Sequence, residues 1–102
     1  MTDTTHTPGL WLVADTTVYS LQSDGHVLVN RFSAHVQTGV GRDAQRTPLA
    51  ELEANARLMA EAPNLLAALQ EVLPLAENWG HPDHPGIAAA RAAIARATGG
   101  AV

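Results

Sequence analysis

The side chains in this chain that are best suited to chemistry are arginines and one asparagine, and the chemistry that they could perform is the binding of a small anion. Asn55 and Arg57 stand among apolar neighbours in a segment with helical spacing, LEANARLMAEA at residues 52–62. Asparagine is a mediocre helix former, so its place inside a helix indicates that its amide is used. The two side chains lie on different flanks of the helix and could hold a ligand across a subunit interface. In the alternative interpretation, which the spacing alone favours, Asn55 bonds to nearby backbone and Arg57 pairs with Glu53 or Glu61.

A second candidate anion site is the loop at residues 39–46. Arg31, Arg42 and Arg46 stand in or near it against a single acid, Asp43. Backbone amides of the GVGR segment and a guanidinium could cradle a phosphate, because arginine recognises phosphate bidentately. The segment matches neither nucleotide-binding glycine motif, so nucleotide hydrolysis and dinucleotide redox chemistry have no support. The sequence alone favours the alternative of a plain mobile loop. Phe32 adjoins this region and could stack on a base, although an aromatic residue in so small a chain is more typical of the core.

Catalytic and metal-binding patterns are absent. No serine lies in a nucleophile elbow and His35 has no evident acid partner, so we expect no enzyme activity and no cofactor. His81, Asp83 and His84 are close in sequence, but Pro82 and Pro85 make this segment rigid enough to hold them apart. They predict an exposed turn rather than a metal site.

Composition excludes several further classes. The 102 residues carry a net charge of -4 and contain neither lysine nor cysteine. An acidic chain is a poor binder of duplex nucleic acid, which needs many phosphate contacts. The absence of cysteine excludes disulfides and thiolate metal sites, and no apolar run reaches the roughly 18 residues that a membrane span needs. The N-terminus has an acid and no basic residue, unlike a signal peptide, so we expect the cytoplasm of a bacterial host.

The elements that must position these residues predict an α+β fold. Residues 1–9 indicate a flexible arm, and residues 10–102 a single domain with a small antiparallel sheet at 10–38 and helices at 47–98. Asp24 and Gly25 between two β-branched runs predict a two-residue hairpin turn, which places Leu21 opposite Leu28 and Tyr19 opposite Asn30.

Two or three helices follow the predicted sheet. Thr47-Pro48 is a typical helix start, and Gly99-Gly100 a typical stop. Pro63 either breaks the first helix at residue 62 or kinks it, because proline removes a helical hydrogen bond and clashes with the preceding turn.

The predicted core is small. Of the 47 hydrophobic residues, 19 are alanine, which contributes little buried area. Val27 and Val29 leave the predicted hairpin apolar on both sides, so a helix layer could cover one side and a partner subunit the other. We therefore expect a homodimer or larger homo-oligomer.

The segment LEANARLMAEAPNLLAAL at residues 52–69 resembles a helical module of small bacteriophage and prophage proteins, with the pattern E-A-N-A-R-L-x-A-x-A-P-x-L-L-x-A-L. In those proteins a D-G hairpin precedes it, as VYSLQSDGHVLVNRF does here, so the resemblance covers roughly residues 10–78. The matching positions are Glu53, Asn55, Arg57, Leu58, Ala62, Pro63, Leu65, Leu66 and Leu69.

Some phage proteins with a similar plan are anti-defence sponges, among them the Thoeris anti-defence proteins. They sequester cyclic ADP-ribose signals at interfaces of a dimer or higher oligomer. The resemblance implies a protein that sequesters a small anionic nucleotide without chemistry, with Asn55 and Arg57 as ligand contacts and the basic loop as the phosphate side.

A different class of function stays open. Five glutamates against Arg57 give residues 51–77 a net charge of -4. An acidic helical face of this kind could mimic nucleic acid or occupy a host surface, which predicts a protein-binding inhibitor of a host defence complex.

Overall fold

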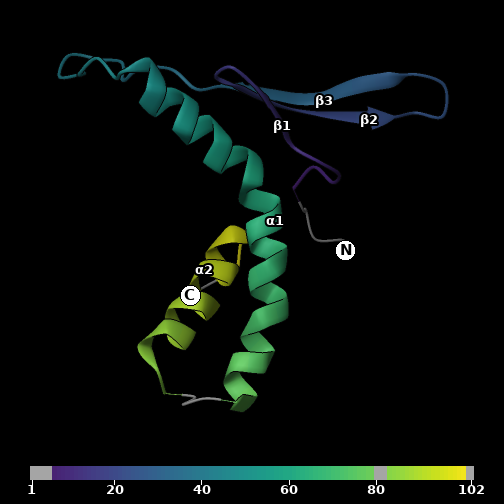
Figure 1. The fold of residues 1–102 in the computed structure, drawn as a ribbon, viewed down its shortest axis with the longest axis vertical. Coiled ribbons are helices and arrows are strands. Elements are labelled where there is room, and N and C mark those ends of the chain that lie inside the picture. Colours follow the sequence, from purple (N-terminus) through teal and green to yellow (C-terminus); the bar gives the residue numbers. More distant parts are fainter. Residues whose placement is uncertain (1–5, 80–82, 101–102) are drawn as a thin grey trace. The chain divides into compact units, whose positions relative to one another are not determined.

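The computed structural model describes residues 6–79 and 83–100, and it confirms the predicted α+β class. Three strands come first, β1 (Leu12–Ala14), β2 (Thr17–Ser23) and β3 (Leu28–His35), and two helices follow, α1 (Leu49–Trp79) and α2 (Pro85–Ala97) (Figure 1). The chain forms two compact units, Met1–Pro63 and Asn64–Val102, which divide within α1. Residues 1–5 of the predicted arm lie outside the described residues.

The sheet is antiparallel with the order β1-β2-β3. The register of β2 and β3 shifts between Ser20, which pairs with Phe32, and Leu21, which pairs with Asn30. Arg31 is therefore the extra residue of a β-bulge. Bulges are common on edge strands, where they interrupt the ladder and redirect side chains.

The predicted register of the hairpin is wrong by two residues. Ser23 pairs with Leu28, so the loop has the four residues 24–27 instead of the two residues Asp24 and Gly25. The Asp24 carboxylate accepts hydrogen bonds from the amides of His26 (2.9 Å) and Val27 (3.0 Å), and the Asp24 amide donates to the Val27 carbonyl (3.1 Å). An aspartate side chain that bonds to the amides ahead of it lengthens the turn in this way. Gly25 lies in the turn at φ 101°, a conformation that glycine adopts without strain.

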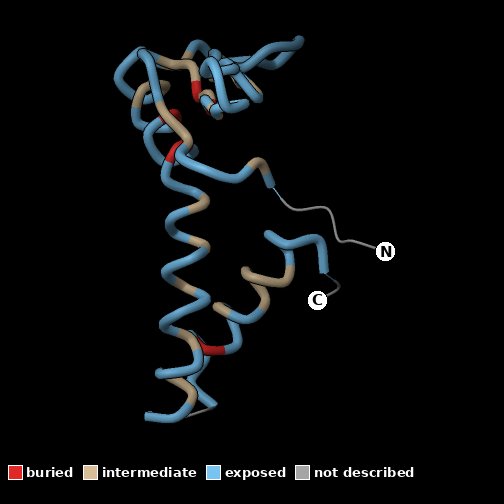
Figure 2. Tube along the Cα trace, turned by 90° about the vertical axis from the view of Figure 1, so that its right-hand side faces the viewer, coloured by how far each residue is buried: buried red, intermediate tan, exposed pale blue. Residues whose placement is uncertain are grey.

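The core of the first unit is built where β2 meets the first turns of α1. Val18 and Ala56 are completely buried and Ala60 nearly so. Figure 2 colours buried residues red, and most of the chain is exposed or intermediate. Alanine has a small side chain, so the helix backbone can approach the sheet closely. Around this contact pack three partly buried apolar side chains, Trp11, Phe32 and Val36.

Trp11 also ties the start of the described chain to this core. Its ring meets that of Phe32 at a centroid separation of 4.8 Å, and its indole N–H donates to the Thr7 carbonyl at 3.0 Å. Gln22 donates to the Pro8 carbonyl at 2.7 Å. Segment 7–8, which the sequence places in the arm, is thus bonded to the sheet unit.

Helix α1 begins directly after Thr47-Pro48, as predicted, and of the two alternatives at Pro63, a break or a kink, the break does not occur. The helix continues through Pro63 and Pro74 to Trp79. Each proline removes one helical hydrogen bond. The alanine- and leucine-rich turns around them have a high helix propensity, which holds the helix together.

The second unit is a helical hairpin made by the last part of α1 and α2. Ile87 is its buried residue, and Arg91 of α2 forms an ion pair with Glu77 of α1. His84 caps α2, because its Nδ1 accepts the Gly86 amide at 2.9 Å. The predicted stop is confirmed: α2 ends at Ala97, and the Gly100 amide bonds to the Ala95 carbonyl at 2.7 Å.

Among the described residues, neither helix has a stretch that is long and apolar enough to cross a membrane.

Replacing Ala56 by leucine is expected to lower the free energy of unfolding by about 1–3 kcal/mol, because the larger side chain must enter a closed contact between helix and sheet. Ala54→Leu, on an exposed position of the same helix, should change it by no more than about 0.5 kcal/mol. Urea denaturation followed by circular dichroism measures both variants. Equal effects would contradict the central place of Ala56 in the core.

The hairpin turn is expected to depend on the charge of Asp24. The amide of Val27, and next that of His26, donate to this carboxylate and lower its pKa below the ordinary value of 3.8. The stabilisation is complete above that ordinary value and is lost as the pH falls through the lowered pKa. An NMR titration should give a midpoint below 3.8 for this carboxyl, accompanied by shifts of the two amides. An Asp24→Asn variant should lack the transition, and a midpoint above the ordinary value would refute the assignment.

Candidate functional site

The first unit contains a cleft of about 610 Å³ where the end of β3, the segment after it and the first turn of α1 come together. Its volume lies in the range of small-molecule sites, about 300–1,000 Å³. The residues that line it are Thr16, His35, Val36, Gln37, Thr38, Arg46, Thr47, Pro48, Leu49 and Leu52.

One hydroxyl group holds the loop that forms a wall of this cleft. Thr38 Oγ1 accepts a hydrogen bond from the Thr47 amide at 2.7 Å and donates to the Gln45 carbonyl at 3.1 Å. These bonds bring the two ends of the basic loop, residues 39–46, against each other. As a result Arg46 stands beside the start of α1.

His35 is the one imidazole among the lining residues. Its Nδ1 lies 3.5 Å from the Thr16 hydroxyl and 3.4 Å from the Thr17 hydroxyl, at the long end of hydrogen-bond distance. The adjacent Val36 amide donates to the Thr16 carbonyl at 2.8 Å, which fixes this end of β3 against the β1–β2 turn. The ring is thereby oriented through one nitrogen, and Nε2 makes no hydrogen bond with the described part of the chain.

The electrostatics of the cleft favour an anion. The amides of Glu51 and Leu52 both donate to the Pro48 carbonyl at 3.1 Å, whereas those of Leu49 and Ala50 have no acceptor among the described residues. Free amides at a helix N-terminus carry partial positive charge and bind anions. No carboxylate lines the cleft.

Arg46 adds a full positive charge to this arrangement. Arg46 forms no ion pair with a carboxylate within residues 6–79 and 83–100. Val36, Leu49 and Leu52 supply an apolar wall beside it. The cleft can therefore hold a ligand that has an anionic group and a less polar body.

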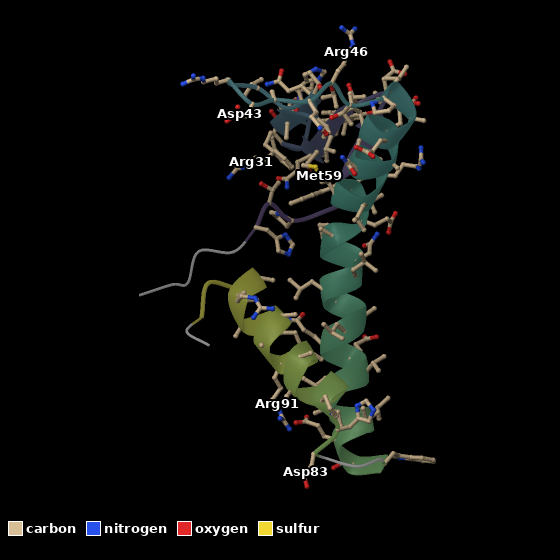
Figure 3. The ribbon with its side chains drawn as sticks, turned by 90° about the vertical axis from the view of Figure 1, so that its left-hand side faces the viewer. Arg31, Asp43, Arg46, Met59, Asp83 and Arg91 are labelled. Carbon is tan, nitrogen blue, oxygen red and sulfur yellow. The ribbon has the colours of Figure 1, made fainter. Side chains whose placement is uncertain are left out.

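Of the six ligand-binding residues that the sequence predicts, the structure brings Arg46 into the cleft and leaves the other five outside it. Figure 3 shows Arg31 and Arg46 projecting in different directions, so these two guanidinium groups do not converge within one chain. Arg42 is exposed in the loop and does not line the cleft. Phe32 is half-buried and packs against Trp11 in the core.

Asn55 and Arg57 lie on opposite flanks of α1, with the buried Ala56 between them. Successive residues are about 100° apart around a helix, so the two side chains point away from each other. Both are exposed, and neither makes a hydrogen bond or ion pair with the described residues. The partners expected in the structural interpretation, nearby backbone for Asn55 and Glu53 or Glu61 for Arg57, are thus not found.

The sequence did not identify several lining residues, His35, Thr38 and Leu49 among them. His35 and Leu52 are distant in sequence, and they meet because β3 and α1 pack on the same core. For Thr38 the local signal was a hydroxyl group at the edge of the loop, since hydroxyl groups near a turn commonly bond to backbone.

The glutamates of α1 are divided between the two units. In the first unit, Glu61 lies about 80° around the helix from both Glu51 and Glu53 by helix geometry, so the three share one broad side. In the second unit, Glu71 and Glu77 are about 120° apart, and Glu77 is engaged by Arg91. A protein-binding role for an acidic helical face stays a prediction.

Within residues 6–79 and 83–100, no group of three histidine or carboxylate side chains is arranged to hold a metal ion. His81 lies outside the described residues, Asp83 is exposed, and His84 caps α2.

Comparison with known proteins gives one finding. A family model described as Salmonella phage P22 protein Y8K6 matches residues 1–101 of the chain. No curated protein and no solved structure matches it. The family match extends over every residue that lines the cleft.

Alanine substitutions at Asn55 and Arg57 are expected to leave the fold intact. Asn55→Ala should raise the free energy of unfolding by up to about 0.7 kcal/mol, since alanine is the better helix former. Arg57→Ala should change it by less than about 0.5 kcal/mol, because an exposed side chain without a partner is removed. Urea denaturation tests both. A loss of about 1 kcal/mol or more at either position would restore the structural interpretation.

Proposed function

The chain belongs to the family of Salmonella phage P22 protein Y8K6, and on this premise we propose that it binds and sequesters a cyclic nucleotide immune signal of the bacterial host without converting it. The observation that carries the proposal is the cleft of about 610 Å³, in which the unpaired Arg46 stands at the N-terminus of α1. Its site of action would be the cytoplasm of the host cell.

The chemistry of the cleft matches the parts of such a signal. A phosphate or pyrophosphate group would be bound by the Arg46 guanidinium and by the free amides of Leu49 and Ala50. The sugar and base would lie along the apolar wall of Val36 and Leu52. A cyclic ADP-ribose isomer and a cyclic oligonucleotide both combine these parts.

The composition of the cleft supports binding rather than turnover. His35 is the one lining side chain with an imidazole or carboxyl group, and its Nδ1 faces two threonine hydroxyls. General acid–base catalysis usually needs a positioned pair of such groups. A sponge needs tight binding instead, because it competes with a host receptor for the signal.

The other predicted ligand-binding residues would have different roles. Arg42 would add long-range attraction from the loop. Arg31, Asn55 and Arg57 do not line the cleft, so they would contact a ligand only from a second copy of the chain. Phe32 would serve the core through its contact with Trp11.

The direct test is a thermal-shift screen with cyclic ADP-ribose isomers, cyclic dinucleotides and cyclic trinucleotides. A ligand at about 100 times its dissociation constant adds roughly 2.7 kcal/mol of stability. For a domain of this size that is a shift of Tm on the order of 10 °C. A flat response across the panel would overturn the proposal, and a host lysate pulldown would then test for a protein partner.

With the ligand that the screen selects, Arg46→Ala is expected to weaken binding by about 10- to 100-fold, because it removes a charge-assisted hydrogen-bonding group. Arg42→Ala is the matched control, since it removes the same charge from the same loop outside the cleft. It should weaken binding by less than about threefold, through long-range attraction alone. Isothermal titration calorimetry measures both. Equal losses in the two variants would contradict the placement of the ligand in the cleft.

A further inference from the structure

The second unit carries an exposed apolar stripe with the spacing of a coiled coil. Leu65, Val72 and Trp79 follow one another at intervals of seven along α1, and Leu75 comes three residues after Val72. Their exposed fractions are 54%, 54%, 88% and 60%. Residues at this spacing form one side of a helix, and a second helix is the surface that this pattern fits.

A groove of about 490 Å³ runs along the same side of the unit, between α1 and α2. Its walls are almost entirely apolar, and Val72 and Trp79 belong both to the stripe and to the groove. The remaining lining residues are Leu69, Leu73, Ala76, His84, Gly86, Ile87 and Ala90. One surface therefore presents both protruding side chains and a hollow that can receive them.

Charge does not oppose the approach of an identical surface. Between residues 64 and 79 the acids are Glu71 and Glu77, and the ion pair with Arg91 neutralises the second. Counting Asp83 as well, three acids of this unit stand against Arg91 and Arg96, which is a net charge of -1. Two copies of this unit would meet with little electrostatic repulsion.

We propose that a second copy of this chain covers the stripe and the groove, so that the two helical hairpins form a four-helix bundle. Two helices alone leave an apolar side without a second layer, and pairing with an equivalent hairpin supplies that layer. A surface that has both the protruding side chains of the stripe and the groove that can receive them is self-complementary, which is the condition for a twofold dimer.

The apolar area supports this occupant. Each partner of a stable interface buries roughly 800 Å². Trp79 alone can contribute about 150–250 Å² of it, and three exposed aliphatic side chains and the walls of the groove add to this. This inference does not depend on the ligand or on the cleft of the first unit.

Cysteine cross-linking tests the arrangement, because the natural chain contains no cysteine. Val72 is the middle residue of the stripe from Leu65 to Trp79, so it meets its own copy whether the two α1 helices run parallel or antiparallel. A Val72→Cys variant should form a disulfide-linked dimer in high yield under mild oxidation. Ala67→Cys, exposed on the same helix but outside the stripe, is the matched control and should stay largely uncross-linked.

Light scattering of the full-length chain gives an independent measurement. The natural chain should have about twice the monomer mass of 10.7 kDa, and Leu75→Glu should have the monomer mass with its helical circular dichroism retained. Ala67→Glu should remain dimeric. A monomeric natural chain, or a Leu75→Glu variant that is still dimeric, would overturn the proposal. Equal cross-linking of the Val72→Cys and Ala67→Cys variants would also overturn it. The cross-linking test remains decisive if Leu75→Glu unfolds, because it does not use that variant.

Discussion

The structure of the first unit depends on the contact between one strand and one helix through very small side chains. Val18 of β2 and Ala56 of α1 are fully buried, and the aromatic rings of Trp11 and Phe32 close over them. This contact sets the position of α1 relative to the sheet. The cleft depends on this contact, because the end of β3 and the first turn of α1 face each other only when the helix packs against the sheet in this way.

Within this packing arrangement, a few polar groups make the cleft positively charged, although each of them contributes only a modest free energy. The Thr38 hydroxyl joins the two ends of the basic loop by hydrogen bonds, and Arg46 therefore lies beside the N-terminus of α1. The free amides of α1 and the guanidinium then act in the same region, and no carboxylate lines the cleft, although Glu51 lies in the first turn of the same helix. The positive character of the site therefore arises from placement, in a chain whose net charge is -4.

A core this small leaves much apolar surface exposed, and the exposed part is organised. In the second unit the exposed apolar residues of the stripe share one side of α1, and Val72 and Trp79 also border a groove. Self-association would therefore complete the fold in the same way that larger domains do within one chain. The alanine-rich composition and the exposed leucines both go with a short chain that forms only a small core.

The sequence by itself determined the elements of this protein. Periodicity and end signals predicted the α+β class, the start of α1 after Thr47-Pro48 and the end of α2 before Gly99-Gly100, because these depend on neighbouring residues. It did not determine the hairpin register, which the Asp24 carboxylate decided by bonding to two amides, nor the continuity of α1 through Pro63. The tertiary structure decided the site: of six predicted residues it brought Arg46 to the cleft, and it added His35 and Thr38. The physical reason is that residues distant in sequence meet only when sheet and helix pack on a shared core. No local sequence pattern encodes how these two elements pack.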